Sequence, residues 1–244
     1  MTLPYGPFRL GLALVYGAIW LALAIAPWDR GDWALENGLV AVAAVVLVAS
    51  ARALPLSRVS YSLIFVFLCL HAVGAHYTYA EVPYNAWTEA LFGRPLNDVM
   101  GWQRNHFDRL VHFLYGLLLA YPIRELFLRI ANVRGFWGYF LPLDLTMSTS
   151  MLYELIEWAA AIIVGGDLAD SYLGQQGDIW DAHKDMALAS AGALVAMIIT
   201  MLINWRLNRD FAREWAESLR VKSRVPLGER TILRWLRQRR LGNG

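Results

Sequence analysis

The chain has 244 residues, of which 57% are hydrophobic and 17% are charged, and its net charge is only +2. The charged share of an average soluble domain is about 25%, so this composition, together with 11 tryptophans, indicates an integral membrane protein and excludes an ordinary water-soluble enzyme. The single cysteine, Cys69, lies in an apolar segment and excludes an intrachain disulfide.

Six long apolar segments follow one another along the chain, each about as long as a membrane-spanning helix. About 20 apolar residues in a helix cross the hydrocarbon core of a bilayer. The apolar segments leave no stretch long enough for a separate soluble domain. We therefore expect an all-α polytopic membrane protein, a bundle of about six transmembrane helices. The predicted spans are Phe8–Ala26, Leu35–Ala53, Val59–Tyr79, Phe107–Leu126, Tyr139–Val164 and Asp185–Trp205.

The first two spans carry no ionisable residue in their apolar interiors, and we interpret them as scaffold or as a lipid-facing layer. The first span has a second interpretation as a cleaved signal peptide, because residues 24–26 resemble a cleavage site. Pro27 and the weakly basic start of the chain favour a retained span. A functional site is expected from the spans within residues 59–205, inside one six-span domain of residues 1–205.

Basic residues are concentrated on one side of the predicted membrane topology. Short loops rich in Lys and Arg remain in the cytoplasm. The loop around Arg52 and Arg58 and the loop from Arg124 to Arg134 fall on one side, together with the tail of residues 206–244 and its 11 basic residues. This distribution predicts that both termini are cytoplasmic.

The tail has the periodicity of amphipathic helices. Leu207, Phe211, Trp215 and Leu219 recur every four residues between arginines, and a second basic stretch follows at residues 232–237. Such helices bind anionic lipid headgroups through basic side chains and an apolar face. We therefore predict membrane lipids as the partner of the tail and do not expect a nucleic-acid partner.

Glu154 and Glu157 lie near the centre of the fifth predicted span. A carboxylate at the centre of a bilayer costs about 2.5–3.5 kcal/mol on insertion scales. The two residues are three apart and share one face of a helix. Both therefore have to face other helices, which predicts a buried polar site.

Three further segments bring acids and histidines to the same outer layer of the membrane. Asp108 and His112 are four residues apart, as are Asp181 and Asp185, so each pair shares a helix face. We expect these side chains to meet the two glutamates. The predicted catalytic residues are Asp108, Arg109, Glu154 and Glu157. The predicted metal ligands are His71, His112, Glu154, Asp178, Asp181 and Asp185.

Six carboxylates in this predicted group face one clearly adjacent cation, Arg109. Such an excess cannot stay ionised and unpaired in a partly desolvated site. Either some carboxyl groups hold protons or a cation is bound. Imidazole with carboxylates suits a divalent transition metal such as zinc, manganese or iron. A hydrogen-bonded network that only holds helices together, and a proton relay, are the alternatives.

Four ordered motifs give the chain a resemblance to the YjdF-type bacterial inner-membrane proteins, a family without an assigned molecular function. The resemblance implies a multi-pass protein of the bacterial inner (plasma) membrane and extends to about residue 205. The motifs are His71-Ala-Val-Gly-Ala-His-Tyr-Thr-Tyr, Asn105-His-Phe-Asp-Arg-Leu-Val-His-Phe, Tyr153-Glu-Leu-Ile-Glu-Trp and Gly177-Asp-Ile-Trp-Asp-Ala-His-Lys-Asp.

A more distant resemblance, over about residues 105–200, is to VanZ-like membrane proteins. Those proteins have an Asp-Lys-x-x-His-Phe type element, and Arg109 stands here in place of the lysine. They often have a glutamine at the position of Glu157. The resemblance implies work on the envelope side of the membrane and specifies no reaction.

The leading functional hypothesis is a metal-dependent activity on a lipid-linked or envelope substrate that enters from the outer leaflet. In that hypothesis Asp108, His112, Glu154, Asp181 and Asp185 supply ligands or a general base. The rivals are a proton- or cation-coupled transporter and a non-catalytic envelope assembly factor. The sequence leaves open whether the protein is an enzyme and how many copies assemble.

Overall fold

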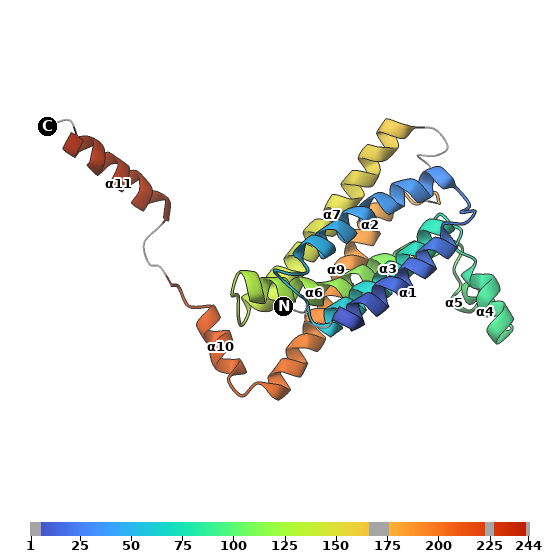
Figure 1. The fold of residues 1–244 in the computed structure, drawn as a ribbon, viewed down its shortest axis with the longest axis horizontal. Helices are drawn as coiled ribbons and strands as arrows, with labels where there is room; N and C mark the ends of the chain where they lie inside the picture. The colour runs from blue at the N-terminus through green and yellow to red at the C-terminus, as the bar shows by residue number, and fades with distance from the viewer. Residues whose placement is uncertain (1–5, 166–175, 223–226, 243–244) are drawn as a thin grey trace.

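The structure is a computed structural model, and it describes residues 6–165, 176–222 and 227–242. These residues form helices joined by loops, with no strand among them (Figure 1). The helices are α1 (Gly6–Leu23), α2 (Arg30–Ser50), α3 (Arg58–His76), α4 (Tyr84–Phe92), α5 (Leu96–Met100), α6 (Phe107–Ile130), α7 (Trp137–Val164), α9 (Asp181–Leu207), α10 (Phe211–Ser218) and α11 (Leu227–Gly242).

Five of the described helices, α1, α2, α3, α6 and α9, are long and apolar enough to cross a membrane. The all-α polytopic fold is therefore confirmed. The helix α7, which corresponds to the fifth predicted span, is not among these five. It carries Glu154 and Glu157 in its second half and packs against both α6 and α9. A sixth membrane pass stays a prediction.

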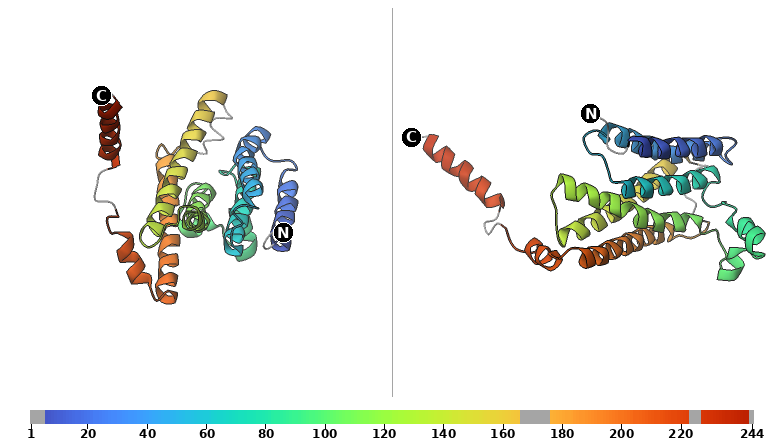
Figure 2. Two further views of the ribbon diagram at one scale, coloured as in Figure 1. Left: turned by 60° about the vertical axis from the view of Figure 1, so that its left-hand side comes forward. Right: turned by 60° about the horizontal axis from the view of Figure 1, so that its bottom comes forward.

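The long helices form two layers that meet at α6. Helices α1 and α2 pack on α3, and α3 packs on α6, whose other side contacts α7 and α9 (Figure 2). Helix α3 runs antiparallel to α6 and α9, so α3 ends at the end of the bundle at which α6 and α9 begin. We call this end of the bundle, at His76 and Phe107, the site end. The short helices α4 and α5 project beyond it (Figure 1).

The closest helix contact lies between α6 and α9, and it depends on two glycines. A Cβ atom on Gly116 would overlap the carbonyl oxygen of Ala189, and a Cβ atom on Gly192 would overlap that of Phe113. Ala189 and Ala193 are fully buried at this crossing. Small residues at such positions let two helix backbones approach in a membrane. The crossing fixes how side chains near the site end of α6 and α9 face each other.

The two tail helices behave differently from each other. Phe211 and Trp215 on α10 pack against Tyr139 of α7, and the Trp137 indole N–H donates to the Ser218 carbonyl at 2.8 Å. Two residues of the apolar stripe that the sequence assigned to lipid, Phe211 and Trp215, are therefore covered by the bundle, whereas Leu207 and Leu219 are exposed. Helix α11 extends away from the bundle, and its apolar residues are exposed (Figure 1).

Candidate functional site

Three donor side chains from α6 and α9 converge just inside the site end. One ligand atom from each of Asp108, His112 and Asp185 lies within 4.8 Å of the others. A fourth donor comes from α7, because Glu154 Oε1 lies 3.6 Å from His112 Nε2. We call these four residues the donor group. Three helices that are distant in sequence therefore contribute to one small volume.

Two distances from His112 suit ligands of a shared ion better than direct hydrogen bonds. His112 Nε2 is 3.5 Å from Asp108 Oδ1 and 3.6 Å from Glu154 Oε1. A side-chain contact of about 3.6 Å is too long for a hydrogen bond. Nitrogen and oxygen ligands at about 2.0–2.2 Å from a tetrahedral ion lie about 3.3–3.6 Å apart. The two measured distances fall in or at the edge of that interval.

Two oxygens of the donor group are buried without a hydrogen-bond partner in the described part of the chain, Glu154 Oε1 and Asp185 Oδ1. Asp185 is only 2% exposed. A buried polar atom without a partner costs about 1–3 kcal/mol, and more when it is charged. The donor set of three carboxylates and one imidazole fits a divalent zinc, manganese or iron ion, whose charge would offset this cost.

Helix periodicity explains why these side chains meet. On α6, Asp108 and His112 precede Gly116 at intervals of four residues, so all three lie along one ridge. On α9, Asp185 precedes the buried Ala189 by the same interval. The ridges cross where Gly116 contacts Ala189; His112 and Asp185 lie one turn, and Asp108 two turns, toward the site end. The acids of α6 and α9 therefore lie close together, while their role as ligands stays a prediction.

Helix α2 contributes acids that the sequence did not assign to the site. Asp32 and Glu36 are 2% and 4% exposed, so the interpretation of the first two spans as mere scaffold is wrong for α2. The reason is that α2 begins at Arg30, capped by Asp29, and draws both acids into its first turns. The Tyr153 hydroxyl of α7 donates to Glu36 Oε2 at 3.2 Å. The one available signal was the four-residue spacing of the two acids.

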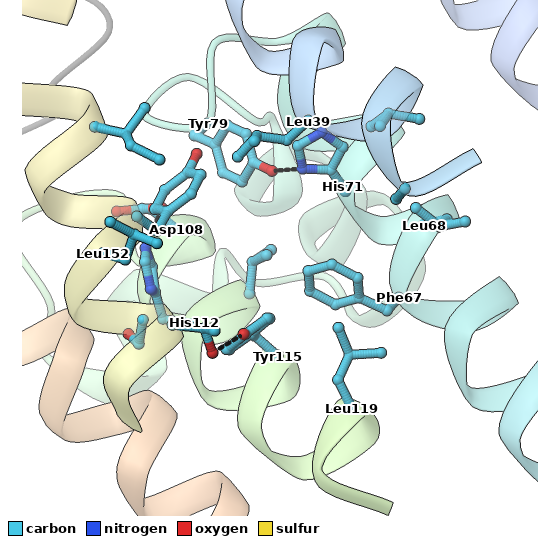
Figure 3. Close-up of a pocket in the computed structure, with 17 residues that line it drawn as sticks. Leu39, Phe67, Leu68, His71, Tyr79, Asp108, His112, Tyr115, Leu119 and Leu152 are labelled. Carbon is cyan, nitrogen blue, oxygen red and sulfur yellow. Dashed lines mark hydrogen bonds and ion pairs between the residues drawn. The ribbon is translucent and has the colours of Figure 1, made fainter. Parts of the chain in front are cut away.

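His71 lies on a wall near the donor group and is not one of its members. Its Nε2 donates to the Glu36 carbonyl at 3.2 Å, and its Nδ1 accepts from the Tyr79 hydroxyl (Figure 3). Both ring nitrogens are therefore engaged, and His71 is left out of the ligand set. Gly74 makes room for this arrangement, because a Cβ atom there would lie 2.6 Å from the Tyr79 ring.

The outermost charges form ion pairs with one another. Arg104 and Arg109 both reach Asp181, at 2.7 and 2.9 Å, and Arg109 also reaches Asp178 at 2.5 Å. Lys184 Nζ lies 2.5 Å from Asp178. We call these five residues the ion-pair layer. Asp178 and Asp181, predicted as metal ligands, are instead held by cations, because α9 begins at Asp181 and leaves Asp178 in the preceding loop.

The ion-pair layer changes the charge count made from the sequence. Arg104 and Lys184 join Arg109 there, so the outer aspartates are neutralised and the excess of acid lies deeper, in the donor group and around Glu36. The Lys184 ammonium, the Trp180 backbone N–H and the Arg109 guanidinium hold the pKa of the Asp178 carboxyl well below its usual range. Arg104 was missed because it lies in a loop without helical periodicity.

Glu157, predicted as catalytic, lies beside the donor group. It is one helical turn from Glu154 on α7, and its side chain is partly buried.

Comparison with known proteins agrees with this architecture. The family model described as "Predicted membrane protein (DUF2238)" matches residues 8–206. Inner membrane protein YjdF of Escherichia coli (strain K12) is 37% identical over 200 residues, which cover 82% of this chain and 91% of the relative. No solved structure matches the chain.

These matches confirm the resemblance to YjdF-type proteins and support a membrane location; the likeness to VanZ-like proteins stays a prediction. The family match begins two residues into α1 and ends one residue before α9 does. It therefore spans all four donors and the ion-pair layer, and it leaves α10 and α11 outside. The chain belongs to the DUF2238 family of membrane proteins.

Proposed function

We propose that the protein is a metal-dependent enzyme of the inner membrane that acts on a lipid-linked or envelope substrate. The observation that carries the proposal is the donor group itself. Ligand atoms of Asp108, His112 and Asp185 lie within 4.8 Å of one another, Glu154 Oε1 lies 3.6 Å from His112 Nε2, and two of the buried oxygens have no hydrogen-bond partner in the described chain. Intramembrane acids of this kind mark functional sites more often than packing.

Asp108, His112, Glu154 and Asp185 would hold the ion. A divalent ion at such a site acts as a Lewis acid and ionises a water molecule near neutral pH. Glu157, one helical turn from Glu154 on α7, would serve as the general base for this water molecule. The reaction class is hydrolysis or group transfer at a head group that carries an oxyanion.

Arg109 is the residue that we assign to the oxyanion. Its Nη2 is engaged by Asp178 and Asp181, whereas its Nε is buried without a hydrogen-bond partner in the described residues. The guanidinium fork can add one contact to a phosphate or carboxylate oxygen without releasing its aspartates. Arg109 was predicted as a catalytic residue, and Asp178 and Asp181 would orient its guanidinium for this role.

An enzyme is favoured over a coupled transporter by the packing beyond the donor group. Toward the other end of the bundle, the α6–α9 interface is filled by Ala120, Ala193 and Met197, all buried. A transporter needs polar steps on both sides of its ion site. The described residues place an apolar layer at the α6–α9 interface there, and the buried polar groups beside it, Thr146, Ser150 and Thr200, are uncharged hydroxyls.

We further propose that both termini are cytoplasmic, that the chain crosses the membrane six times, and that the site end faces the outer leaflet. The basic loops and tail support this orientation through the positive-inside rule. Helix α11 then lies on anionic headgroups, with Ile232, Leu233 and Trp235 exposed beside its arginines. The Arg239 guanidinium stacks over the Trp235 ring at 4.4 Å, which suits the interface.

Metal analysis of purified protein tests the proposed function. We expect close to one zinc, manganese or iron ion per chain, and loss of the ion in Glu154→Gln and Asp185→Asn while both variants stay folded. Asp144→Asn is the matched control, because Asp144 lies on α7 like Glu154 but is exposed near the other end. Wild-type protein without stoichiometric metal, and without a gain in thermal stability from the added ions, would refute the proposal.

A further inference from the structure

A cavity of about 320 Å³ opens beside the donor group. Its walls come from α2, α3, α6 and α7, and from Tyr79 after α3 (Figure 3). Asp108 and His112 form part of one wall, so the cavity and the donor group share surface. Away from these two residues the lining is largely aliphatic and aromatic, and it includes Leu39, Phe67 and Leu119.

Two pairs of polar groups in the cavity wall are hydrogen-bonded to each other, while Ser150 Oγ is buried without a partner in the described residues. Tyr79 donates to His71, and the hydroxyls of Tyr115 and Thr149 share a hydrogen bond of 2.6 Å (Figure 3). These pairs turn the aromatic rings toward the cavity and leave few groups to bind water. Apolar cavities of this kind remain dry and accept apolar guests. A free sugar or peptide would need more polar partners.

The cavity reaches the outside of the bundle between α2 and α7. Leu39 of α2 and Leu152 and Ile156 of α7 line the cavity, yet they are 40%, 53% and 39% exposed. Side chains that both line a cavity and face outward mark its opening. Because α2 is a candidate membrane span, this opening faces the acyl chains of the bilayer.

We propose that this cavity takes a single hydrocarbon tail of a lipid substrate, entering sideways between α2 and α7, with the head group at the donor group. The proposal rests on the proposed function, and it names the substrate class as a lipid. A methylene group occupies about as much volume as a water molecule, about 30 Å³. The cavity therefore holds about ten methylene groups, a large part of one lipid tail.

The test uses full-length protein in nanodiscs of phosphatidylethanolamine and phosphatidylglycerol, doped with phosphatidylglycerol that carries a photoactivatable diazirine in one acyl chain. After irradiation, mass spectrometry maps the adducts. We expect adducts on Phe67 and Leu119 inside the cavity, which saturate as the probe fraction rises. Adducts on Val45 and Val48, which face outward, should rise without saturation.

Ala43→Phe places a ring into the cavity, because Ala43 lines it. We expect the adducts inside the cavity to fall to the level seen without irradiation. Ala44→Phe is the control, since Ala44 is exposed on the same helix and is not part of the lining. Leu119→Trp narrows the cavity from the side of α6. It is the second test variant if Ala43→Phe does not fold, and the same loss of cavity adducts is expected.

Two results would overturn the proposal: adducts confined to outward-facing residues, or cavity adducts that never saturate. The metal content of each variant is measured in parallel. Cavity adducts in a protein without metal would refute the proposed metal chemistry but not the binding of a lipid tail in the cavity. A full metal content with no cavity adduct would refute the binding of a lipid tail but not the metal chemistry.

Discussion

Replacing Gly116 by alanine tests whether the α6–α9 crossing positions the donor group. The added Cβ would overlap the Ala189 carbonyl oxygen and lie 2.6 Å from the Ala193 nitrogen. Both neighbours are backbone atoms, so the helices themselves have to separate. Overpacking of this kind costs about 1–3 kcal/mol. For a chain of this size, each kcal/mol lowers the melting temperature by about 2–4 °C, so we expect a fall of about 2–12 °C.

Tryptophan fluorescence during thermal unfolding in detergent measures this fall, and metal content is measured on the same sample. We expect the bound metal to decrease as well, because separation of the helices moves Asp185 away from His112. Gly17→Ala is the matched control: Gly17 lies within α1, and a Cβ there would meet nothing within 4 Å. Alanine favours a helix over glycine by about 0.5–1 kcal/mol, so this variant should be at least as stable as wild type.

An unchanged melting temperature in Gly116→Ala would refute the close crossing. A lower melting temperature with full metal content would refute a different step, the claim that the crossing aligns the donors. The two measurements therefore separate the packing argument from the site argument. A Gly17→Ala variant that loses as much stability as Gly116→Ala would show a general sensitivity to glycine replacement.

Three further expectations concern the surface and the tail. Trp215→Ser should expose α10 to protease, because the Trp215 ring packs on Tyr139. Trp235→Ser should release only α11 from the membrane surface, and the release should depend on salt. Equal protease sensitivity of α10 and α11 in both variants would contradict the difference between the two helices. A topology reporter at Leu91 should read as external and one fused to the C-terminus as cytoplasmic; the reverse would move the site to the inner leaflet. Because the pKa of Asp178 is depressed in the folded protein, its ionised carboxylate stabilises the fold at pH values above the ordinary aspartate pKa of about 3.9. Asp178→Asn should therefore be less stable than wild type near neutral pH, and the difference should shrink as the pH falls toward the depressed pKa.

The helical spans could be predicted because the apolar pattern depends on local sequence alone. Each described span begins within five residues of its prediction, and α2 deviates most. Hydropathy placed the start of α2 at Leu35, since Asp29, Arg30 and Asp32 make the preceding turns polar. The structure continues the helix back to Arg30 because Asp29 caps its first amides. A cap extends a helix where hydropathy alone would end it.

The donor group was predictable in part. Asp108, His112, Glu154 and Asp185 lie on helices, where spacing states which side chains share a face. Two predicted ligands outside the donor group, His71 and Asp181, also lie on helices, where spacing gives the shared face but not the partner. His71 faces the site but uses both ring nitrogens, and its partner Tyr79 follows the end of α3 in a turn. Such partners depend on contacts between distant segments, which no periodicity encodes.

The geometry of the site follows from where the glycines lie relative to the donors. Helix axes commonly pack 8–10 Å apart, and donors on two such helices reach one ion only when their side chains converge. Gly116 and Gly192 reduce the separation, and His112 lies one turn from the first of these contacts. Moving Gly116 by one position would turn it by about 100° around α6. The close contact would then face away from α9, and Asp185 would lose its neighbour although every donor residue remained in the chain.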